Sequence, residues 1–208
     1  MVPELETSRL RLRPWRTSDL KAAVEIYSNG EVARYLGRTP RAWTGPADAH
    51  AALARWASFE GPRYGVWAIV PHDEDDPVGS ALLKLLPYSS GETSPDTEVG
   101  WHLHPRVWGR GYATEAGGRL LEHAWTHGIE EVFAVTYPAN LASQAVCARL
   151  LRAVQGGPAQ LIGATTARFH AVGVGAVAVR TVRDQGVCAD ARKWCYPAFS
   201  KTDRVVTR

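Results

Sequence analysis

The sequence predicts a single α/β (α+β) domain built on a mixed, mostly antiparallel twisted sheet with helices on both faces. Three observations lead to this expectation. A first strand is followed by helical segments, three strands then follow one another over residues 64–103, and a helix and further strands come after them. The length of 208 residues suffices for one full hydrophobic core and is short for two ordinary domains.

Residues 9–13 alternate basic and apolar side chains, which predicts a strand with one wet face. Threonine, serine and aspartate at 17–19 are residues that cap helices, so a helix is expected over 20–27. An Asn-Gly pair ends this helix, and a short second helix is expected over 31–36. A third begins at a Thr-Gly-Pro sequence and runs from 44 to about 61.

Three strands are expected next, over 64–70, 78–86 and 98–103, where aromatic, β-branched and leucine residues concentrate. We expect them to form an antiparallel meander. The acidic turn at 72–77 contains histidine, aspartates and a glutamate, and we interpret it as a solvated hairpin tip, although this residue set is also compatible with a metal site. A polar loop over 87–95 precedes the third strand.

The most informative stretch is 97–121, whose pattern indicates a strand, a turn and the start of a helix. His104 and Pro105 end the strand, because proline cannot donate a backbone hydrogen bond and biases its predecessor away from helix. The helix is expected to run to about His127.

The turn within this stretch has the chemistry of an anion site. A helix start leaves backbone N–H groups without partners and carries a partial positive charge. Gly109 and Gly111 would let a ligand approach that backbone, and Arg106 and Arg110 add positive charge beside it. Such a site suits phosphates. Glycines placed only for tight geometry are the alternative that the turn alone leaves open.

The spacing of these residues separates several kinds of phosphate site. It lacks the lysine of a nucleotide-binding P-loop and does not match the dinucleotide fingerprint. It resembles the acyl-CoA signature R/Q-x-x-G-x-G/A of the GNAT N-acetyltransferase superfamily, matched by Arg106, Gly109 and Gly111. The strings W-G-R-G-Y-A-T-E-A over 108–116 and L-E-T-S-R-L-R-L-R-P over 5–14 resemble the RimJ/RimL-type branch of that superfamily.

This resemblance covers residues 5–150 well and 160–182 weakly. It implies the GNAT fold with strands splayed at the acyl-CoA site, and transfer of an acetyl group from acetyl-CoA to a primary amine of a protein N-terminus or a small molecule. The loop over 87–95 would lie beside this acceptor. No metal is expected, and a homodimer is left open. The expected cofactor-binding residues are Trp101, His102, Leu103, Arg106, Gly109, Arg110, Gly111, Tyr112, Ala113 and Asn140.

Two residues are expected to act in catalysis. Glu98, on the strand that leads into the loop, would take a proton from the amine directly or through water, with an ordinary strand-end glutamate as the alternative. The resemblance implies that Asn140 contacts the cofactor and that Ser143 lies near the cofactor's sulfur, although both residues also suit a helix cap and first turn. His102 and His104 are weaker candidate bases. A strand N–H near 101–103 would polarise the thioester carbonyl.

The chain after the central helix is expected to contain a strand over 131–136, a helix that Asn140 caps, and a hairpin over 162–182. We predict one domain over 1–183 and a loosely packed basic tail over 184–208, whose deletion leaves CoA binding unchanged. Residues 1–150 carry 15 basic and 18 acidic side chains, and residues 151–208 carry 9 and 3.

The charge shift has two open explanations, a basic extension or a shifted reading frame. With a shifted reading frame, the competing functional class would be a non-catalytic or impaired acyl-CoA-binding protein.

Composition excludes other classes of partner. The net charge of +3 is too small to argue for nucleic acid. No apolar run reaches the roughly 18 residues of a membrane span, and the first residues lack a secretory signal. The three cysteines, Cys147, Cys188 and Cys195, are odd in number and lack metal-ligand spacing, which favours free thiols. We therefore expect a cytoplasmic enzyme with no membrane or nucleic-acid partner.

Overall fold

A computed structural model describes residues 2–37, 39–87, 93–129, 131–156, 165–172 and 176–183. Its strands are β1 (Leu5–Glu6), β2 (Leu10–Pro14), β3 (Gly65–Pro71), β4 (Gly79–Pro87), β5 (Thr93–Leu103), β6 (Glu131–Thr136), β7 (Thr165–Val172) and β8 (Ala176–Arg183). Its α-helices are α1 (Leu20–Tyr27), α2 (Gly30–Ala33), α3 (Pro46–Ala57), α4 (Tyr112–Thr126) and α5 (Leu141–Gly156), and two 3-10 helices are η1 (Thr17–Asp19) and η2 (Pro105–Val107).

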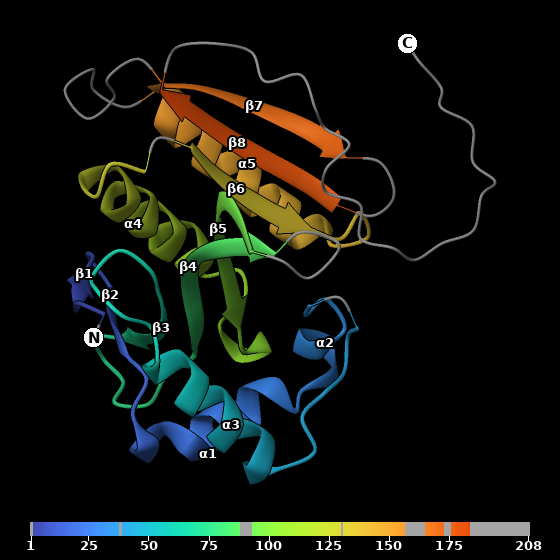
Figure 1. Cartoon of the computed structure of the whole chain (residues 1–208). Helices are drawn as coiled ribbons and strands as arrows, with labels where there is room; N and C mark the ends of the chain where they lie inside the picture. Colours follow the sequence, from blue (N-terminus) through green and yellow to red (C-terminus); the bar gives the residue numbers. More distant parts are fainter. Residues whose placement is uncertain are drawn as a thin grey trace.

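The strands form one sheet in the order β1-β2-β3-β4-β5-β6-β8-β7. Neighbouring strands are antiparallel except for β5 and β6, which are parallel and are connected through α4. Figure 1 shows β1 to β4 on one side of β5, and β6, β8 and β7 with α5 on the other. The predicted fold class, a mixed and mostly antiparallel sheet with flanking helices, is confirmed.

Helices cover both faces of the sheet, and successive side chains of β3 pack alternately against the two helical layers. Trp67 and Ile69 point into a core that includes residues of α4 and α5. Val66, Ala68 and Val70 point the other way, into a second core formed with α1, α2 and α3. A strand that is buried on both faces has side chains that are apolar throughout, as β3 is over its whole length.

The expected wet face of β2 is wrong at Arg13, whose side chain is only 3% exposed. Its guanidinium forms two hydrogen bonds with Asp19, of 2.7 and 2.9 Å. The Asp19 carboxylate also accepts from the backbone N–H of Arg16 at 2.8 Å. A buried charge is tolerated where it is paired and hydrogen-bonded, so Arg13 can occupy the face that the second core covers.

Other boundaries differ from the sequence expectations in small ways. The second helix spans Gly30–Ala33 rather than 31–36, and β5 already begins at Thr93, within the expected polar loop. β7 and β8 form the expected hairpin. Residues 184–208 lie outside the described part of the chain. Among the described helices, none combines the length and the apolarity needed to cross a bilayer.

Candidate active site

β5 and β6 separate within the sheet. They pair only at Thr97 with Val132 and at Glu98 with Phe133, and no described strand pairs with the β6-facing edge of β5 beyond Glu98. The other edge of β5 stays paired with β4 as far as Leu103. The predicted splay is therefore present, and it leaves an open strand edge in the middle of the sheet.

The orientation of the peptide groups along this edge follows from two hydrogen bonds. The Leu103 carbonyl accepts from Nε1 of Trp108 at 2.8 Å, whereas the His104 N–H donates to the Val78 carbonyl at 2.9 Å, on the side of β4. Peptide groups alternate in direction along a strand. The N–H and the carbonyl of Trp101 therefore both point to the gap, and those of His102 both point to β4. The geometry supports the expected backbone role for Trp101 and Leu103 but not for His102.

The turn that follows η2 presents backbone to this gap. Gly109 and Gly111 adopt φ of 78° and 83°, a left-handed conformation that glycine takes at little cost. Gly111 is the N-cap of α4 and has no side chain with which to cap the first N–H groups of the helix, those of Tyr112 and Ala113. A Cβ at Gly109 would meet no atom within 4 Å, so the approach to this backbone is open.

The two arginines of the turn differ in their partners. Arg106 forms a bidentate pair with Glu74 of the acidic turn, with N–O distances of 3.1 and 2.5 Å. These hydrogen bonds raise the pKa of Arg106, and Glu74 offsets its charge. In the described part of the chain, no ion pair involves Arg110, which is exposed. Arg110 is thus the more available cation for a phosphate.

The acidic turn is therefore more than the solvated tip that its sequence suggests. One of its carboxylates holds Arg106 in place. No group of three or more side chains suited to a metal ion occurs among the residues that the structure describes.

Sequence reasoning missed a second contact of the turn, between Glu115 in the first turn of α4 and the segment that precedes β2. Oε1 of Glu115 accepts from the hydroxyls of Thr7 and Ser8 at 2.6 and 3.1 Å and from the N–H of Arg9 at 2.9 Å. Burial alone would raise the pKa of the Glu115 carboxyl, but these bonds together outweigh it and lower the pKa. Both segments lie in the RimJ/RimL-like strings, but no local pattern shows that they meet.

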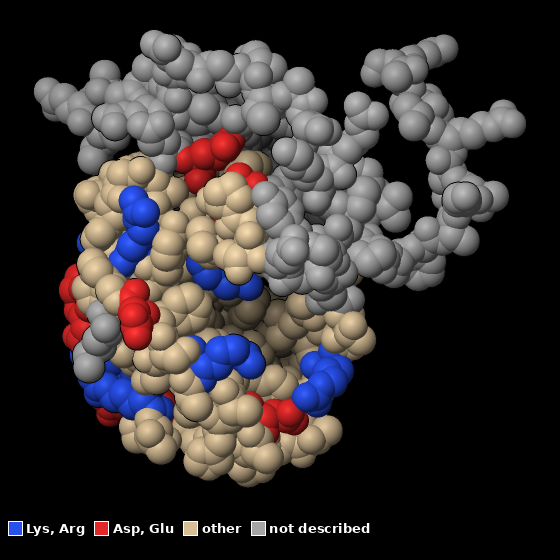
Figure 2. Space-filling model, in the orientation of Figure 1, with Lys and Arg blue, Asp and Glu red and all other residues tan. Residues whose placement is uncertain are grey.

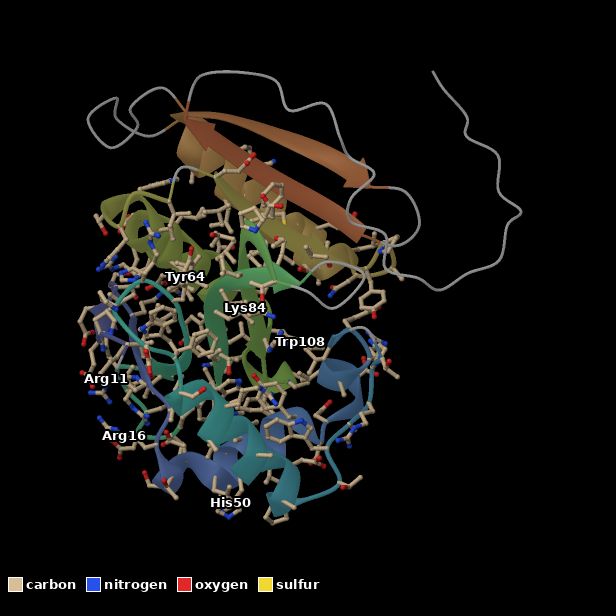
Figure 3. The ribbon with its side chains drawn as sticks, viewed as in Figure 1. Arg11, Arg16, His50, Tyr64, Lys84 and Trp108 are labelled. Atoms are coloured by element: carbon tan, nitrogen blue, oxygen red, sulfur yellow. The ribbon has the colours of Figure 1, made fainter. Side chains whose placement is uncertain are left out.

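Glu98 and Lys84 lie opposite one another on β5 and β4, and their charged groups are 3.2 Å apart. The Glu98 side chain retains 16% exposure, and it points away from the α4–α5 core because its neighbours Thr97 and Val99 are the buried ones. Figure 2 shows a hollow on this face with basic side chains on its rim, and Figure 3 places Lys84 and Trp108 at this opening. Glu98 is therefore beside the gap and reachable from solvent.

His102 lies on the same face of β5 as Glu98 and joins a buried polar chain. The indole of Trp15 and the hydroxyl of Tyr27 both donate to Oγ of Ser80, at 3.1 and 2.6 Å. The Tyr27 oxygen is 3.2 Å from Nδ1 of His102, and because its only proton goes to Ser80, Nδ1 is the donor there. Desolvation, with Lys84 nearby, lowers the pKa of His102 to about 4, so the imidazole is neutral at pH 7.

The turn between β6 and α5 forms the other side of the gap. Oδ1 of Asn140 accepts from the N–H of Ser143 at 3.0 Å, which is the expected N-cap. Two tyrosines join this turn to the segment after α2, because Tyr35 donates to the Ala139 carbonyl at 3.2 Å and Tyr137 donates to the Gly37 carbonyl at 2.7 Å. These bonds connect the turn that follows β6 with the N-terminal half of the chain.

Cys147 lies behind the gap, in the core between α5 and the sheet. Its side chain is 1% exposed, and desolvation raises the pKa of its thiol to about 12. It borders an apolar cavity of about 10 Å³ with Val99, Leu121, Val132, Ala134, Leu150 and Leu151. The thiol is thus a core group and a poor nucleophile.

The chain is similar to known proteins in sequence and in fold. Residues 9–150 match the family model described as an acetyltransferase (GNAT) domain. The uncharacterized N-acetyltransferase p20 of Bacillus licheniformis is 26% identical over 140 residues, which are 67% of this chain and 76% of that protein. The FsC-acetyl coenzyme A-N(2)-transacetylase of Aspergillus fumigatus is 30% identical over 152 residues, which are 70% of this chain and 63% of that enzyme.

A solved GNAT-family acetyltransferase from Bacillus anthracis has a similar fold, with a TM-score of 0.64 and 16% identity over 86% of this chain and 98% of that one. The family match begins just before β2, spans the loop with its two left-handed glycines, and ends within the helix that Asn140 caps. The chain therefore belongs to the GNAT acetyltransferase family.

Proposed function

We propose that this protein transfers the acetyl group of acetyl-CoA to a primary amine by direct attack of the amine on the thioester. The observation that carries the proposal is the open edge of β5 beside the uncapped start of α4. The strand edge offers peptide groups to an extended chain such as pantetheine, and the helix start offers N–H groups to a diphosphate. The relative from Aspergillus fumigatus, whose name specifies acetyl coenzyme A and a nitrogen, supports this donor and this kind of acceptor.

The residues present fit this donor. The N–H groups of Tyr112 and Ala113, with the approach that Gly109 leaves open, would contact the phosphates, and Arg110 would add a cation. The open N–H and carbonyl of Trp101 would face the pantetheine arm. That N–H is the donor best placed for the thioester carbonyl.

The amine must lose a proton before or as it attacks. At pH 7 this costs about 4–5 kcal/mol for a lysine-like amine and about 1 kcal/mol for an α-amino group. Glu98 takes this proton directly or through a water molecule. Ser143 would lie near the leaving sulfur, where its hydroxyl can donate a hydrogen bond to the thiolate until the thiolate takes a proton from solvent. One C–N bond forms as one C–S bond breaks, and no covalent enzyme intermediate is required.

The free energy needed to deprotonate the amine also bears on the class of acceptor. An α-amino group needs less help from a base, and the two RimJ/RimL-like strings, which meet at Arg9 and Glu115, support a protein N-terminus as the acceptor. Small-molecule amines are the second class to test. We assign the protein to the RimJ/RimL-type branch on those strings.

The test is turnover of acetyl-CoA by the full chain across a panel of amines, with mass spectrometry of the acceptor for the added acetyl group. The panel contains peptides with free and with blocked N-termini, amino acids, polyamines and aminoglycosides. We expect acetylation of at least one free amine. Saturable CoA binding without turnover on any acceptor would instead support the non-catalytic acyl-CoA-binding protein, and absence of CoA binding would overturn both.

A further inference from the structure

Arg9 lies next to the phosphate-binding turn although it is far from it in sequence. Its NH1 donates to the Arg110 carbonyl at 2.9 Å, and its Nε and NH2 bind Oε2 of Glu115 at 2.7 and 2.5 Å. The guanidinium also lies 5.1 Å from the ring centroid of Tyr112. We propose that Arg9 is a positioning residue that orients the Arg110–Gly111 peptide for CoA binding, an inference that depends on the proposed function.

The geometry of the peptide bond supports this role. The described chain contains no cis peptide, and in a trans peptide the C=O and the following N–H point in opposite directions. Holding the Arg110 carbonyl against Arg9 therefore turns the Gly111 N–H away from Arg9. A Cβ at Gly111 would lie 3.3 Å from NH2 of Arg9, whereas one at Gly109 would meet nothing within 4 Å. The guanidinium is thus packed on one side of the turn and leaves the other side free.

Gly111 makes such a restraint necessary. Glycine adopts positive and negative φ with similar ease, so the Arg110–Gly111 peptide can flip without steric cost at Gly111. A flipped peptide would present its carbonyl oxygen to a phosphate and repel it. The hydrogen bond from Arg9 selects the orientation that presents the N–H.

Arg9 acts through geometry more than through charge. Glu115 lies against its guanidinium and offsets its positive charge, and the same pair keeps the Glu115 carboxylate turned toward Thr7. A lysine at position 9 would keep the charge but, as a single ammonium, would not hold the carbonyl and the carboxylate together in the same planar arrangement. The two explanations therefore predict different results for Arg9→Lys.

The experiment measures CoA affinity by calorimetry, and KM for acetyl-CoA and kcat, in Arg9→Met and Arg9→Lys. We expect both to raise the dissociation constant and KM by about tenfold, the effect of one lost hydrogen bond to a charged group. We expect kcat at saturating acetyl-CoA to stay within about twofold, because contacts to the phosphates are the same before and during the reaction. Arg16→Met is the matched control, since Arg16 is 59% exposed, pairs with Glu4 at 3.4 Å and lies away from the turn (Figure 3).

A second measurement does not depend on activity. In the ligand-free protein, backbone ¹⁵N relaxation at Gly111 and Tyr112 should show lower order parameters in Arg9→Met than in the wild type and no change in Arg16→Met. Glu115→Gln keeps the hydrogen-bond acceptor near Arg9 and should give a smaller rise in KM, and it serves as the second variant if Arg9→Met fails to fold.

Three results would overturn the role of Arg9. The first is unchanged CoA affinity in Arg9→Met, the second is full recovery in Arg9→Lys, which would assign the effect to charge, and the third is an equal loss in Arg16→Met. Each leaves the proposed function intact as long as the wild type binds CoA. A wild type that does not bind CoA would overturn both the role and the function.

Discussion

Glu98 and Phe133 form the last backbone pair between β5 and β6 before the two strands diverge. The residue best suited to act as a base thus lies where the sheet opens, and its side chain projects on the face that Lys84 shares. In the proposed reaction, a carboxylate at this position would contact an acceptor that approaches from that face while the cofactor lies along the strand edge.

Replacing Glu98 by glutamine should lower kcat by about 10²–10⁴, the usual contribution of a general base. CoA affinity should change by less than about twofold, because the side chain lies away from the turn that binds the phosphates. Steady-state kinetics together with calorimetry of CoA binding would separate the two effects. Lys84→Met is the companion variant, since it removes the ion pair but keeps the carboxylate. If Glu98→Gln keeps a kcat near that of the wild type, Glu98 is an ordinary strand residue and not the base.

Gly109→Asp should weaken CoA binding at least tenfold without unfolding the protein, because it places a carboxylate against the diphosphate at the start of α4. Gly61→Asp provides a control with the same backbone cost. Gly61 has φ of 76°, close to the 78° of Gly109, and it too has open space around a Cβ. Calorimetry with CoA should show the loss only in Gly109→Asp. Equal affinities in the two variants would place the phosphates elsewhere.

His102 should make the stability of the protein depend on pH between about 6.5 and 4. Its pKa is lowered from the model-compound value of 6.5 to about 4 in the folded state, so over this interval the unfolded chain binds a proton that the folded chain does not. The contribution to stability is complete above pH 6.5 and falls as the pH approaches 4, by on the order of 3 kcal/mol.

Urea unfolding at pH 7 and at pH 4.5 would measure this dependence. His102→Phe, which cannot titrate, should lose less stability than the wild type between the two pH values, although it is less stable at pH 7 because the contact with Tyr27 is gone. Comparing the loss of stability between pH 7 and pH 4.5 in the two proteins removes the contribution of the other titrating groups, which both proteins share. An equal loss of stability in the two proteins would show that the pKa of His102 is the same in the folded and unfolded states.

The buried pair of Arg13 and Asp19 should be costly to break. Asp19→Ala leaves a guanidinium unpaired at 3% exposure, and we expect the free energy of unfolding to fall by about 3–5 kcal/mol. Glu4→Ala breaks the exposed pair with Arg16 and should cost less than about 1 kcal/mol. Chemical denaturation of both variants at neutral pH gives the comparison. Similar losses in the two would mean that Arg13 finds another partner or reaches water.

Features set by local sequence were predictable. β6 at Glu131–Thr136, the cap of α5 by Asn140 and the glycine turn before α4 agree with the patterns that predicted them. The splay of β5 and β6 was expected only through the resemblance to GNAT proteins, since no periodicity shows where two strands part.

Contacts between distant segments were not predictable. Arg106 looked like a free cation, but its partner Glu74 is 32 residues away, and Arg9 and Glu115 are 106 residues apart. Arg13 looked solvent-facing because the alternation of β2 shows which residues share a face but not whether helices also cover that face. Such pairings depend on how the elements pack, and a single sequence does not encode them in its local pattern.

The open edge of β5 has a consequence for solubility. A strand edge with unpaired peptide groups can recruit a strand from another molecule, which is a common route to aggregation. Trp108 occupies the Leu103 carbonyl at one end of this edge, and the bonds of Tyr35 and Tyr137 join the segment after α2 to the turn that follows β6. Trp108 thus satisfies one carbonyl of this edge, which leaves fewer peptide groups available for edge-to-edge association.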